Sequence, residues 1–169
     1  MEKLIEGKQK LKQYKDRILM IPFKTIYSYL NGIIQIKSLL PAKSTIILCA
    51  AVSDFIPEEL AEHKIQTAEN LDYKLMSAPK ILGKMSSKDH FCVSFKLETD
   101  KKIIKEKMDT SFEKYNVDMI IGNMLNNKEW IWIRHNPHSV NKNDYEINKF
   151  TEKEIVKGIL EGWNIKYTW

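Results

Sequence analysis

An aspartate that follows an apolar run is the first candidate for chemistry in this chain. The run Thr45–Val52 is rich in β-branched residues, which is typical of a strand buried on both faces. Near its end the side chains become small, at Ala50 and Ala51, which lets a ligand approach the backbone. Asp54 follows where the strand should end. Ligands of open parallel sheets bind beyond the carboxyl ends of the strands. Asp54, with Lys64 on the loop that follows, therefore predicts one wall of a ligand pocket. The alternative is that the alanines only pack tightly and the aspartate caps a turn.

Two further predicted strands also end in side chains that could bind a ligand. Phe91–Phe95 is a second buried strand by its composition, and Val117–Ile121 is a third, closed by Gly122 and Asn123. Carboxyl ends of parallel strands meet at one edge of a sheet, so Asp54, Phe95 and Asn123 are expected to share a pocket. An aromatic ring, an amide, a carboxylate and a lysine suit a nucleotide. The ring can stack on the base or sugar, the amide can pair with a base edge, and the lysine can neutralise phosphate oxygens.

The elements that must position these side chains alternate between strands and helices. Apolar residues at helical spacing predict a helix from Thr25, as its N-cap, to a point before Pro41, and another from Thr99 or Asp100 to Tyr115. Strands and helices in this alternation indicate a parallel α/β sheet. We therefore predict an α/β fold, a Rossmann-like, mostly parallel sheet with flanking helices, formed as a single domain by residues 1–169.

Shorter segments complete this prediction. Ile18–Phe23 is interpreted as a short strand that enters a turn, and Leu71–Met76 alternates like a half-exposed strand. Ser77–Lys80 is interpreted as the start of a helix with Pro79 near its first position. A last amphipathic helix is expected from Thr151, which matches a capping box with the glutamate three residues on.

The C-terminal third predicts a β-hairpin over residues 129–148. Glu129–His135 alternates tryptophan and arginine with isoleucine and pairs with Asp144–Asn148 across a polar loop. Its tryptophans lie on one face of the hairpin, and two more lie in the C-terminal segment: Trp130, Trp132, Trp163 and Trp169. Packing within the monomer and a hydrophobic patch for dimerisation are the two interpretations of these rings.

Composition excludes several classes of protein. The 169 residues carry a net charge of +5, with 43% hydrophobic and 29% charged residues, as in ordinary soluble proteins. No apolar run is long enough for a membrane span and no secretory signal is visible, so we expect a cytoplasmic protein with no membrane partner. The only arginines are Arg17 and Arg134, which disfavours a nucleic-acid partner. Cys49 and Cys92 lie in strand-like runs without metal-ligand spacing and are expected to be buried free thiols.

Five motifs in this order and spacing resemble a known family, phosphopantothenoylcysteine synthetase, the phosphopantothenate–cysteine ligase of coenzyme A biosynthesis. They are Ala50-Ala51-Val52-Ser53-Asp54-Phe55, His63-Lys64-Ile65-Gln66, Pro79-Lys80, Ser94-Phe95-Lys96-Leu97-Glu98-Thr99-Asp100 and Gly122-Asn123-Met124-Leu125. The similarity runs from about Tyr14 to the end and corresponds to the C-terminal portion of the ligase. The fourth motif looks like the eukaryotic, ATP-using type rather than the bacterial, CTP-using type.

The resemblance implies a ligase that uses phosphopantothenate and cysteine as substrates, ATP (or CTP) as nucleotide, and Mg²⁺. The implied catalytic residues are Lys64, which would steady negative charge on the phosphates, and Asp54, which would lie close to the nucleotide. Implied nucleotide contacts are Ala50, Ala51, Lys64, Pro79, Lys80, Phe95 and Asn123. No residue is assigned as a metal ligand. The resemblance also implies a homodimer to which the hairpin contributes.

Two features of the family are missing from this sequence: a Gly-rich phosphate-binding turn and an Asn-Phe-Ser-Ser-Gly-like loop that contacts phosphopantothenate. Only Gly7 and Gly32 precede Gly83, and Lys107 is the lysine nearest to the cationic positions expected in the helix after Thr99. Three hypotheses therefore stand beside one another. The chain is a truncated or split ligase whose other half lies elsewhere, a non-catalytic nucleotide-binding or interaction subunit of the family, or, least favoured, a nucleic-acid-binding protein.

Overall fold

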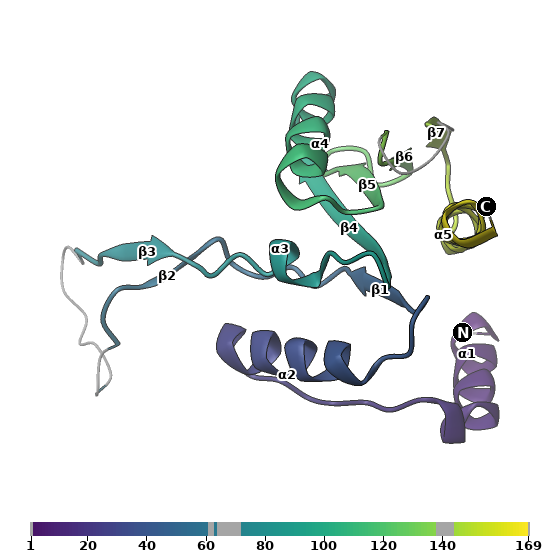
Figure 1. Ribbon diagram of the computed structural model, residues 1–169, viewed down its shortest axis with the longest axis horizontal. Coiled ribbons are helices and arrows are strands. Elements are labelled where there is room, and N and C mark those ends of the chain that lie inside the picture. The colour runs from purple at the N-terminus through teal and green to yellow at the C-terminus, as the bar shows by residue number, and fades with distance from the viewer. Residues whose placement is uncertain (1, 61–62, 64–71, 138–143, 169) are drawn as a thin grey trace.

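The computed structural model describes residues 2–60, 63, 72–137 and 144–168 (Figure 1). The helices are α1 (Glu2–Gln13), α2 (Ile26–Leu39), α3 (Leu82–Met85), α4 (Lys101–Tyr115) and α5 (Glu152–Thr168), with a 3₁₀ turn at Lys15–Arg17. The strands are β1 (Thr45–Leu48), β2 (Phe55–Pro57), β3 (Leu75–Ser77), β4 (Phe91–Glu98), β5 (Met119–Met124), β6 (Trp130–His135) and β7 (Tyr145–Asn148). Within these described ranges, no helix has the length and apolar character needed to cross a membrane.

A five-stranded mixed sheet forms the centre of the fold, in the order β1-β4-β5-β6-β7. β1, β4 and β5 are parallel, with Thr45 opposite Phe91 and Val93 opposite Met119. β6 and β7 add antiparallel strands. The α/β fold, with its parallel strands, flanking helices and C-terminal hairpin, is therefore confirmed. β2 and β3 form a separate antiparallel pair that projects away from the large sheet (Figure 1).

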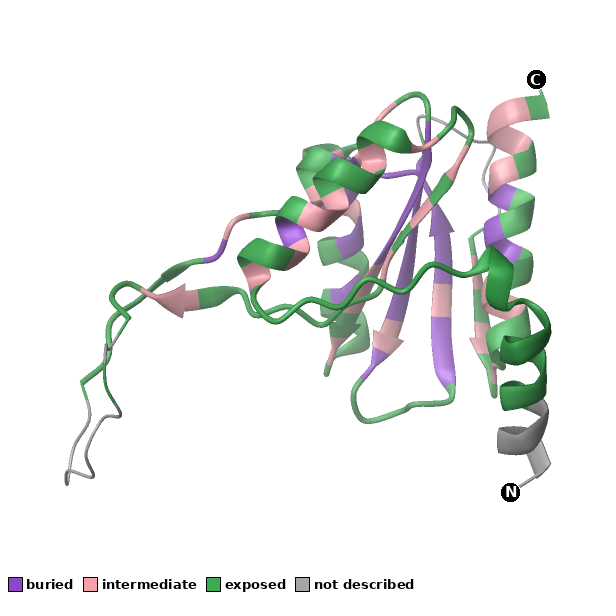
Figure 2. Ribbon diagram, turned by 90° about the horizontal axis from the view of Figure 1, so that it is seen from below, coloured by how far each residue is buried: buried purple, intermediate pink, exposed green. Residues whose placement is uncertain are grey.

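Side chains of the central strands alternate between two hydrophobic cores, one on each face of the sheet. One core packs beneath α2, α3 and α4 and includes Cys92, Ile120 and Trp130. The other packs beneath α5 and includes Val93, Ile121 and Ile133. Figure 2 shows that the buried residues are concentrated in the central strands and on the helix surfaces that face them. Because the central parallel strands β4 and β5 are buried on both faces over most of their length, a ligand can approach them at their carboxyl ends.

Helix ends agree with the capping signals in the sequence. Thr25 caps α2 and forms a reciprocal capping box with Ser28, and Asp100 caps α4 by accepting the N–H of the second helical residue at 2.8 Å. α4 ends at Asn116, whose backbone is left-handed (φ 49°). The Thr151 N–H donates to the Glu154 carboxylate (2.8 Å) at the start of α5. The predicted caps of α2 and α4 are confirmed. At α5 half of the predicted capping box forms: the Glu154 carboxylate accepts from Thr151, but the Glu154 N–H donates to the Thr151 carbonyl (3.1 Å) rather than to its hydroxyl.

The strand interpreted as buried on both faces is instead an edge strand. β1 ends at Leu48 and, among the described strands, hydrogen-bonds only to β4. Its Ile47 side of the sheet lacks the cover that α5 gives the central strands, and Ile47 is 47% exposed. The sequence pattern was misleading because an apolar, β-branched run indicates a strand suited to burial. It does not show whether another strand or a helix covers that strand on each side.

Four smaller predictions were wrong or fall partly outside the description. Ile18–Phe23 is an irregular segment with no strand partner among the described residues, and α3 begins at Leu82, after Pro79 rather than around it. β3 starts only at Leu75, and the first residue of the strand predicted from position 71 is not described. Cys49 is exposed, whereas Cys92 is buried as predicted.

The hairpin of β6 and β7 is confirmed, with Ile131 opposite Ile147. Its tryptophans do not form a shared exposed patch. Trp130 is 3% exposed and belongs to the core beneath α4, and Trp163 packs in the core beneath α5. For these two rings the structure supports packing within the monomer, and Trp169 lies outside the described residues.

Candidate functional site

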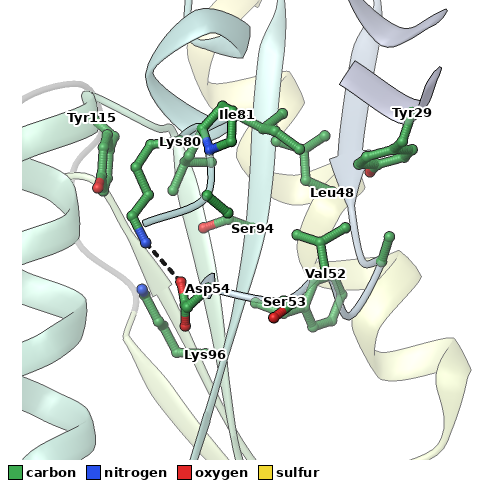
Figure 3. Close-up of a pocket in the computed structure, with 15 residues that line it drawn as sticks. Tyr29, Leu48, Val52, Ser53, Asp54, Lys80, Ile81, Ser94, Lys96 and Tyr115 are labelled. Atoms are coloured by element: carbon green, nitrogen blue, oxygen red, sulfur yellow. Dashed lines mark hydrogen bonds and ion pairs between the residues drawn. The ribbon is translucent and has the colours of Figure 1, made fainter. Parts of the chain in front are cut away.

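A cavity of about 220 Å³ lies beyond the carboxyl ends of β1 and β4, on the side of the sheet covered by α3 and α4 (Figure 3). Its walls join segments far apart in the sequence: the end of β1, the turn before β2, the segment before α3, and β4. The lining residues are Tyr29, Leu48, Ala50, Val52, Ser53, Asp54, Ala78, Pro79, Lys80, Ile81, Leu82, Ser94, Phe95, Lys96 and Tyr115.

Local hydrogen bonds fix the wall that carries Asp54. The Val52 N–H donates to the Ala50 carbonyl (3.1 Å), which tightens the chain directly after β1. The Ser53 hydroxyl accepts the Phe55 N–H (3.2 Å), a serine turn that places Asp54 at its centre. The Asp54 carbonyl accepts the Ala78 N–H (2.9 Å) and so joins this turn to the segment before α3.

Asp54 and Lys80 form an ion pair across the cavity mouth, 2.7 Å between Oδ1 and Nζ (Figure 3). The hydrogen bond from Lys80 lowers the pKa of Asp54, helped by the charges of Lys80, Lys96 and Lys107. The same hydrogen bond raises the pKa of Lys80. The side chains are 77% and 52% exposed, so the pair stabilises the fold little and mainly sets where its charges lie.

β4 presents neighbouring side chains to opposite sides. Phe95 packs against the core beneath α5, yet its edge also lines the cavity that holds Asp54. Lys96 points the other way, towards the Asp54 carboxylate (Figure 3). The strand thus separates an aromatic surface from a cationic one.

A second cavity of about 330 Å³ lies across β4, at the carboxyl ends of β4 and β5 and the start of α5. Asn123 pairs in register with Leu97, and both line this cavity. The complete lining is Phe95, Leu97, Ile121, Asn123, Met124, Leu125, Lys128, Ile131, Phe150 and Ile155. Phe95 is the residue common to the two lining sets, so the cavities adjoin at this residue.

The structure brings the predicted site residues together in two groups rather than in one pocket. Ala50, Asp54, Pro79, Lys80 and Phe95 line the first cavity, whereas Asn123 lines the second. The groups separate because Asp54 enters from a turn on the α4 side of the sheet, whereas Asn123 lines the cavity on the α5 side.

Two of the predicted site residues lie outside these groups. Ala51 is exposed and is absent from the lining of both cavities. Lys64 lies outside the described residues.

Sequence reasoning assigned no role to Ser94 or Lys96, which line the first cavity. The signal was present: they flank Phe95 in a strand, where the period of two puts them together on the opposite face. As for metal, the described part of the chain brings no three histidine, cysteine, aspartate or glutamate side chains together as a cluster suited to an ion.

The molecule has the α/β class of fold, in which ligands commonly bind beyond the carboxyl ends of the parallel strands, where both cavities lie. The family model described as the DNA/pantothenate metabolism flavoprotein C-terminal domain matches residues 3–161. The chain belongs to this family. The resemblance inferred from the five motifs is confirmed.

Named relatives give the same result. The chain is 42% identical over 118 residues to phosphopantothenate–cysteine ligase 1 of Arabidopsis thaliana, covering 64% of this chain and 37% of that protein. It is 30% identical over 163 residues to phosphopantothenate–cysteine ligase CAB2 of Saccharomyces cerevisiae, covering 78% of this chain and 45% of the relative. The chain thus spans less than half the length of these curated relatives.

A solved structure of a Cab2 mutant in complex with phosphopantothenate-cysteine superimposes with a TM-score of 0.80 at 26% identity, covering 96% of this chain and 59% of that one. The DNA/pantothenate metabolism flavoprotein from Streptococcus pneumoniae shares the fold, with a TM-score of 0.62 at 18% identity over 82% of this chain and 69% of that one.

Proposed function

We propose that this chain forms the C-terminal portion of a phosphopantothenate–cysteine ligase of coenzyme A biosynthesis. One observation carries the proposal. Ala50, Asp54, Pro79, Lys80 and Phe95 come from three of the five family motifs and line one cavity, which adjoins a second that contains a fifth-motif residue. Family membership and the names of the relatives support it.

The proposed reaction has two steps. The carboxylate of phosphopantothenate attacks the α-phosphorus of ATP (or CTP), which forms an acyl-nucleotidylate and releases pyrophosphate. The cysteine amine then attacks the activated carbonyl, which forms the amide and releases the nucleoside monophosphate. Two adjoining cavities suit such a reaction, because a nucleotide and an acid must meet before the bond between them forms.

The residue roles are part of the proposal. Lys64 steadies the negative charge that builds on the phosphates, and Asp54 is a carboxylate at the nucleotide. Ala50 and Ala51 offer backbone along the nucleotide, and the other contacts are Pro79, Lys80, Phe95 and Asn123. Mg²⁺ would neutralise phosphate charge, and a single carboxylate suits an ion bound mainly by those phosphates and water.

The edge position of β1 among the described strands supports the hypothesis of a truncated or split enzyme. A parallel strand with an apolar, uncovered edge is ready to pair with a further strand. The relatives are more than twice as long as the segment matched in them, and the Gly-rich phosphate turn has no counterpart in this sequence. The missing turn also keeps open a second candidate function, a non-catalytic nucleotide-binding or interaction subunit.

We further propose a homodimer in the cytoplasm, with phosphopantothenate and cysteine as substrates and no nucleic-acid or membrane partner. The hairpin of residues 129–148 remains the proposed dimerisation element. The Trp130 ring is buried and therefore does not serve as the contact surface of this hairpin.

Pyrophosphate release that depends on both cysteine and phosphopantothenate tests the function. The chain alone should show little or none, and mixing it with the N-terminal half of a related ligase should restore it. Lys64→Ala should abolish the restored activity while the urea unfolding curve stays unchanged. Full activity of the chain alone would refute the incomplete site. No activity in any mixture that forms a complex would favour the non-catalytic subunit.

A further inference from the structure

Two polar side chains on one face of β4 form no hydrogen bond or ion pair with the described residues. The Ser94 residue is 3% exposed, and its buried hydroxyl oxygen makes no hydrogen bond to any part of the chain that the structure describes. Lys96, two residues on and half-buried, forms neither a hydrogen bond nor an ion pair within that same part. Both line the first cavity (Figure 3).

The other charges near this cavity are already compensated. Lys80 is paired with Asp54 at 2.7 Å, and Lys107 is paired with Glu98 at 2.6 Å. Lys80 and Lys96 are the described cations in the lining, and Asp54 is the described carboxylate. The described lining therefore has one more cation than carboxylate: Lys80 forms the ion pair with Asp54, and Lys96 acts on the same carboxylate only through its charge.

Leaving these groups unpaired has a physical cost. A buried hydroxyl without a partner loses the hydrogen bonds that it makes in the unfolded chain, commonly about 1–3 kcal/mol. Lys96 is half-buried, so this cation loses part of its hydration. Groups kept unpaired in this way call for an explanation, and an anionic ligand would satisfy both, since each can donate a hydrogen bond to an oxygen atom.

We propose that Ser94 and Lys96 form an anion-binding pair on the floor of the first cavity, which takes a phosphate or carboxylate group of the ligand. The period of two along β4 places both donors on the same face of the strand, in the lining of the same cavity. The pair does not include Lys64, whose role belongs to the proposed function. The identity of the ligand rests on that proposed function, whereas the binding of an oxyanion by this pair does not.

Equilibrium binding measured by calorimetry tests the pair with three probes: ATP, 4′-phosphopantothenate and pantothenate, which keeps the carboxylate but lacks the phosphate. Lys96→Met should weaken binding of at least one probe about tenfold or more, and Lys96→Arg should retain most of it. Ser94→Ala should weaken the same probe by a smaller factor. A loss confined to ATP and 4′-phosphopantothenate identifies a phosphate, and a loss that extends to pantothenate identifies the carboxylate.

The free energy of unfolding distinguishes ligand binding by Ser94 from a purely structural role of this residue. Removing an unpartnered hydroxyl should leave the unfolding free energy of Ser94→Ala unchanged or higher, while binding falls. The matched control is Lys105→Met, which removes the same charge from an exposed position of α4 outside both cavities and should bind as the wild type does.

The proposal is overturned if the wild type binds none of the probes, if Lys105→Met weakens binding as much as Lys96→Met, or if Ser94→Ala unfolds the protein. Binding that depends on Lys96 but is followed by no ligase activity after reconstitution would sustain the pair and remove the proposed function.

Discussion

At the scale of single residues, the Asp54–Lys80 ion pair decides where charge lies at the mouth of the first cavity. Asp54 keeps its charge to a lower pH than an ordinary aspartate because Lys80 donates a hydrogen bond to it. A carboxylate that stays ionised is available to a metal–nucleotide complex or a cationic group across the whole neutral range. The pair thus fixes the ionisation of the cavity mouth rather than the stability of the fold.

Replacing Lys80 with methionine should raise the pKa of Asp54 towards its ordinary value, since its largest cause of depression is removed. The unfolding free energy should change by less than about 1 kcal/mol, because both side chains are exposed. The pH dependence of the Asp54 carboxyl ¹³C shift measures the pKa. Lys107→Met is the control: its charge is the smallest of the contributing causes, so its shift should be smaller. An unmoved Asp54 pKa in Lys80→Met would show that the ion pair does not form in solution.

At the scale of elements, α5 is held to the sheet by a buried ion pair at the end opposite the cavities. The Lys166 ammonium lies 2.9 Å from Asp118 Oδ1 and also donates to the His90 carbonyl at 2.8 Å. The Asp118 carboxylate accepts the Cys92 N–H at 2.8 Å. Burial still raises the pKa of Asp118, although Cys92 and Lys166 oppose the change. Burial also raises the pKa of the Cys92 thiol, to about 12.

Lys166→Met should destabilise the protein by about 3–5 kcal/mol at neutral pH, because it leaves a buried carboxylate without its counter-charge. The pKa of Asp118 is already raised, and the substitution raises it further. A raised folded-state pKa means that the folded protein binds the proton first as the pH falls, so part of the lost stability returns in acid. Urea unfolding at neutral pH and at about pH 5 measures this difference.

The control for this effect lies on the same helix. Lys157 forms an exposed pair with Glu161 at 3.7 Å, and Lys157→Met should cost about 0.5 kcal/mol or less at either pH. A loss in Lys166→Met that is the same at both pH values would show that the ammonium contributes through packing alone.

Substitutions at two helix glycines test how tightly α5 and α2 pack. A Cβ at Gly162 in α5 would lie 2.6 Å from Phe91 Cζ and 2.7 Å from His135 Nε2, and both rings are buried in place. Gly162→Ala should therefore destabilise by about 1–3 kcal/mol. A Cβ at Gly32 in α2 meets nothing within 4 Å, and Gly32→Ala should stabilise by about 0.5–1 kcal/mol. Thermal or urea unfolding measures both, and equal signs would contradict the packing of α5.

Elements were also the scale at which the sequence was most informative. Caps at Thr25, Asp100 and Thr151 depend on residues three or fewer apart, so local pattern was enough to place α2, α4 and α5. The edge position of β1 was not predictable, because it depends on what lies beside the strand. The division of the site between two cavities was missed for the same reason: shared strand ends were inferred, but not the face each side chain takes.

At the scale of the whole molecule, β1 and its surroundings form an open apolar edge. Ile47 is 47% exposed on a strand whose outer hydrogen-bonding groups have no strand partner in the described parts of the chain. Leu19 and Met20, in the irregular segment before α2, are 83% and 79% exposed. Unprotected edges of this kind pair with other chains unless a neighbouring segment covers them. The chain alone should therefore associate as its concentration rises.

Ile47→Lys should suppress this association, because a charge on an edge strand disfavours edge-to-edge pairing. The residue is half exposed, so the unfolding free energy should change by no more than about 0.5 kcal/mol. Light scattering over a concentration series measures the association. Leu160→Lys is the control, since Leu160 is 57% exposed on the helix α5 rather than on a strand, and should associate as the wild type does. If both variants suppress association equally, general surface hydrophobicity is the cause. If the edge is responsible, Ile47→Lys should also weaken reconstitution with the N-terminal half of a related ligase, because the same edge would receive its strand.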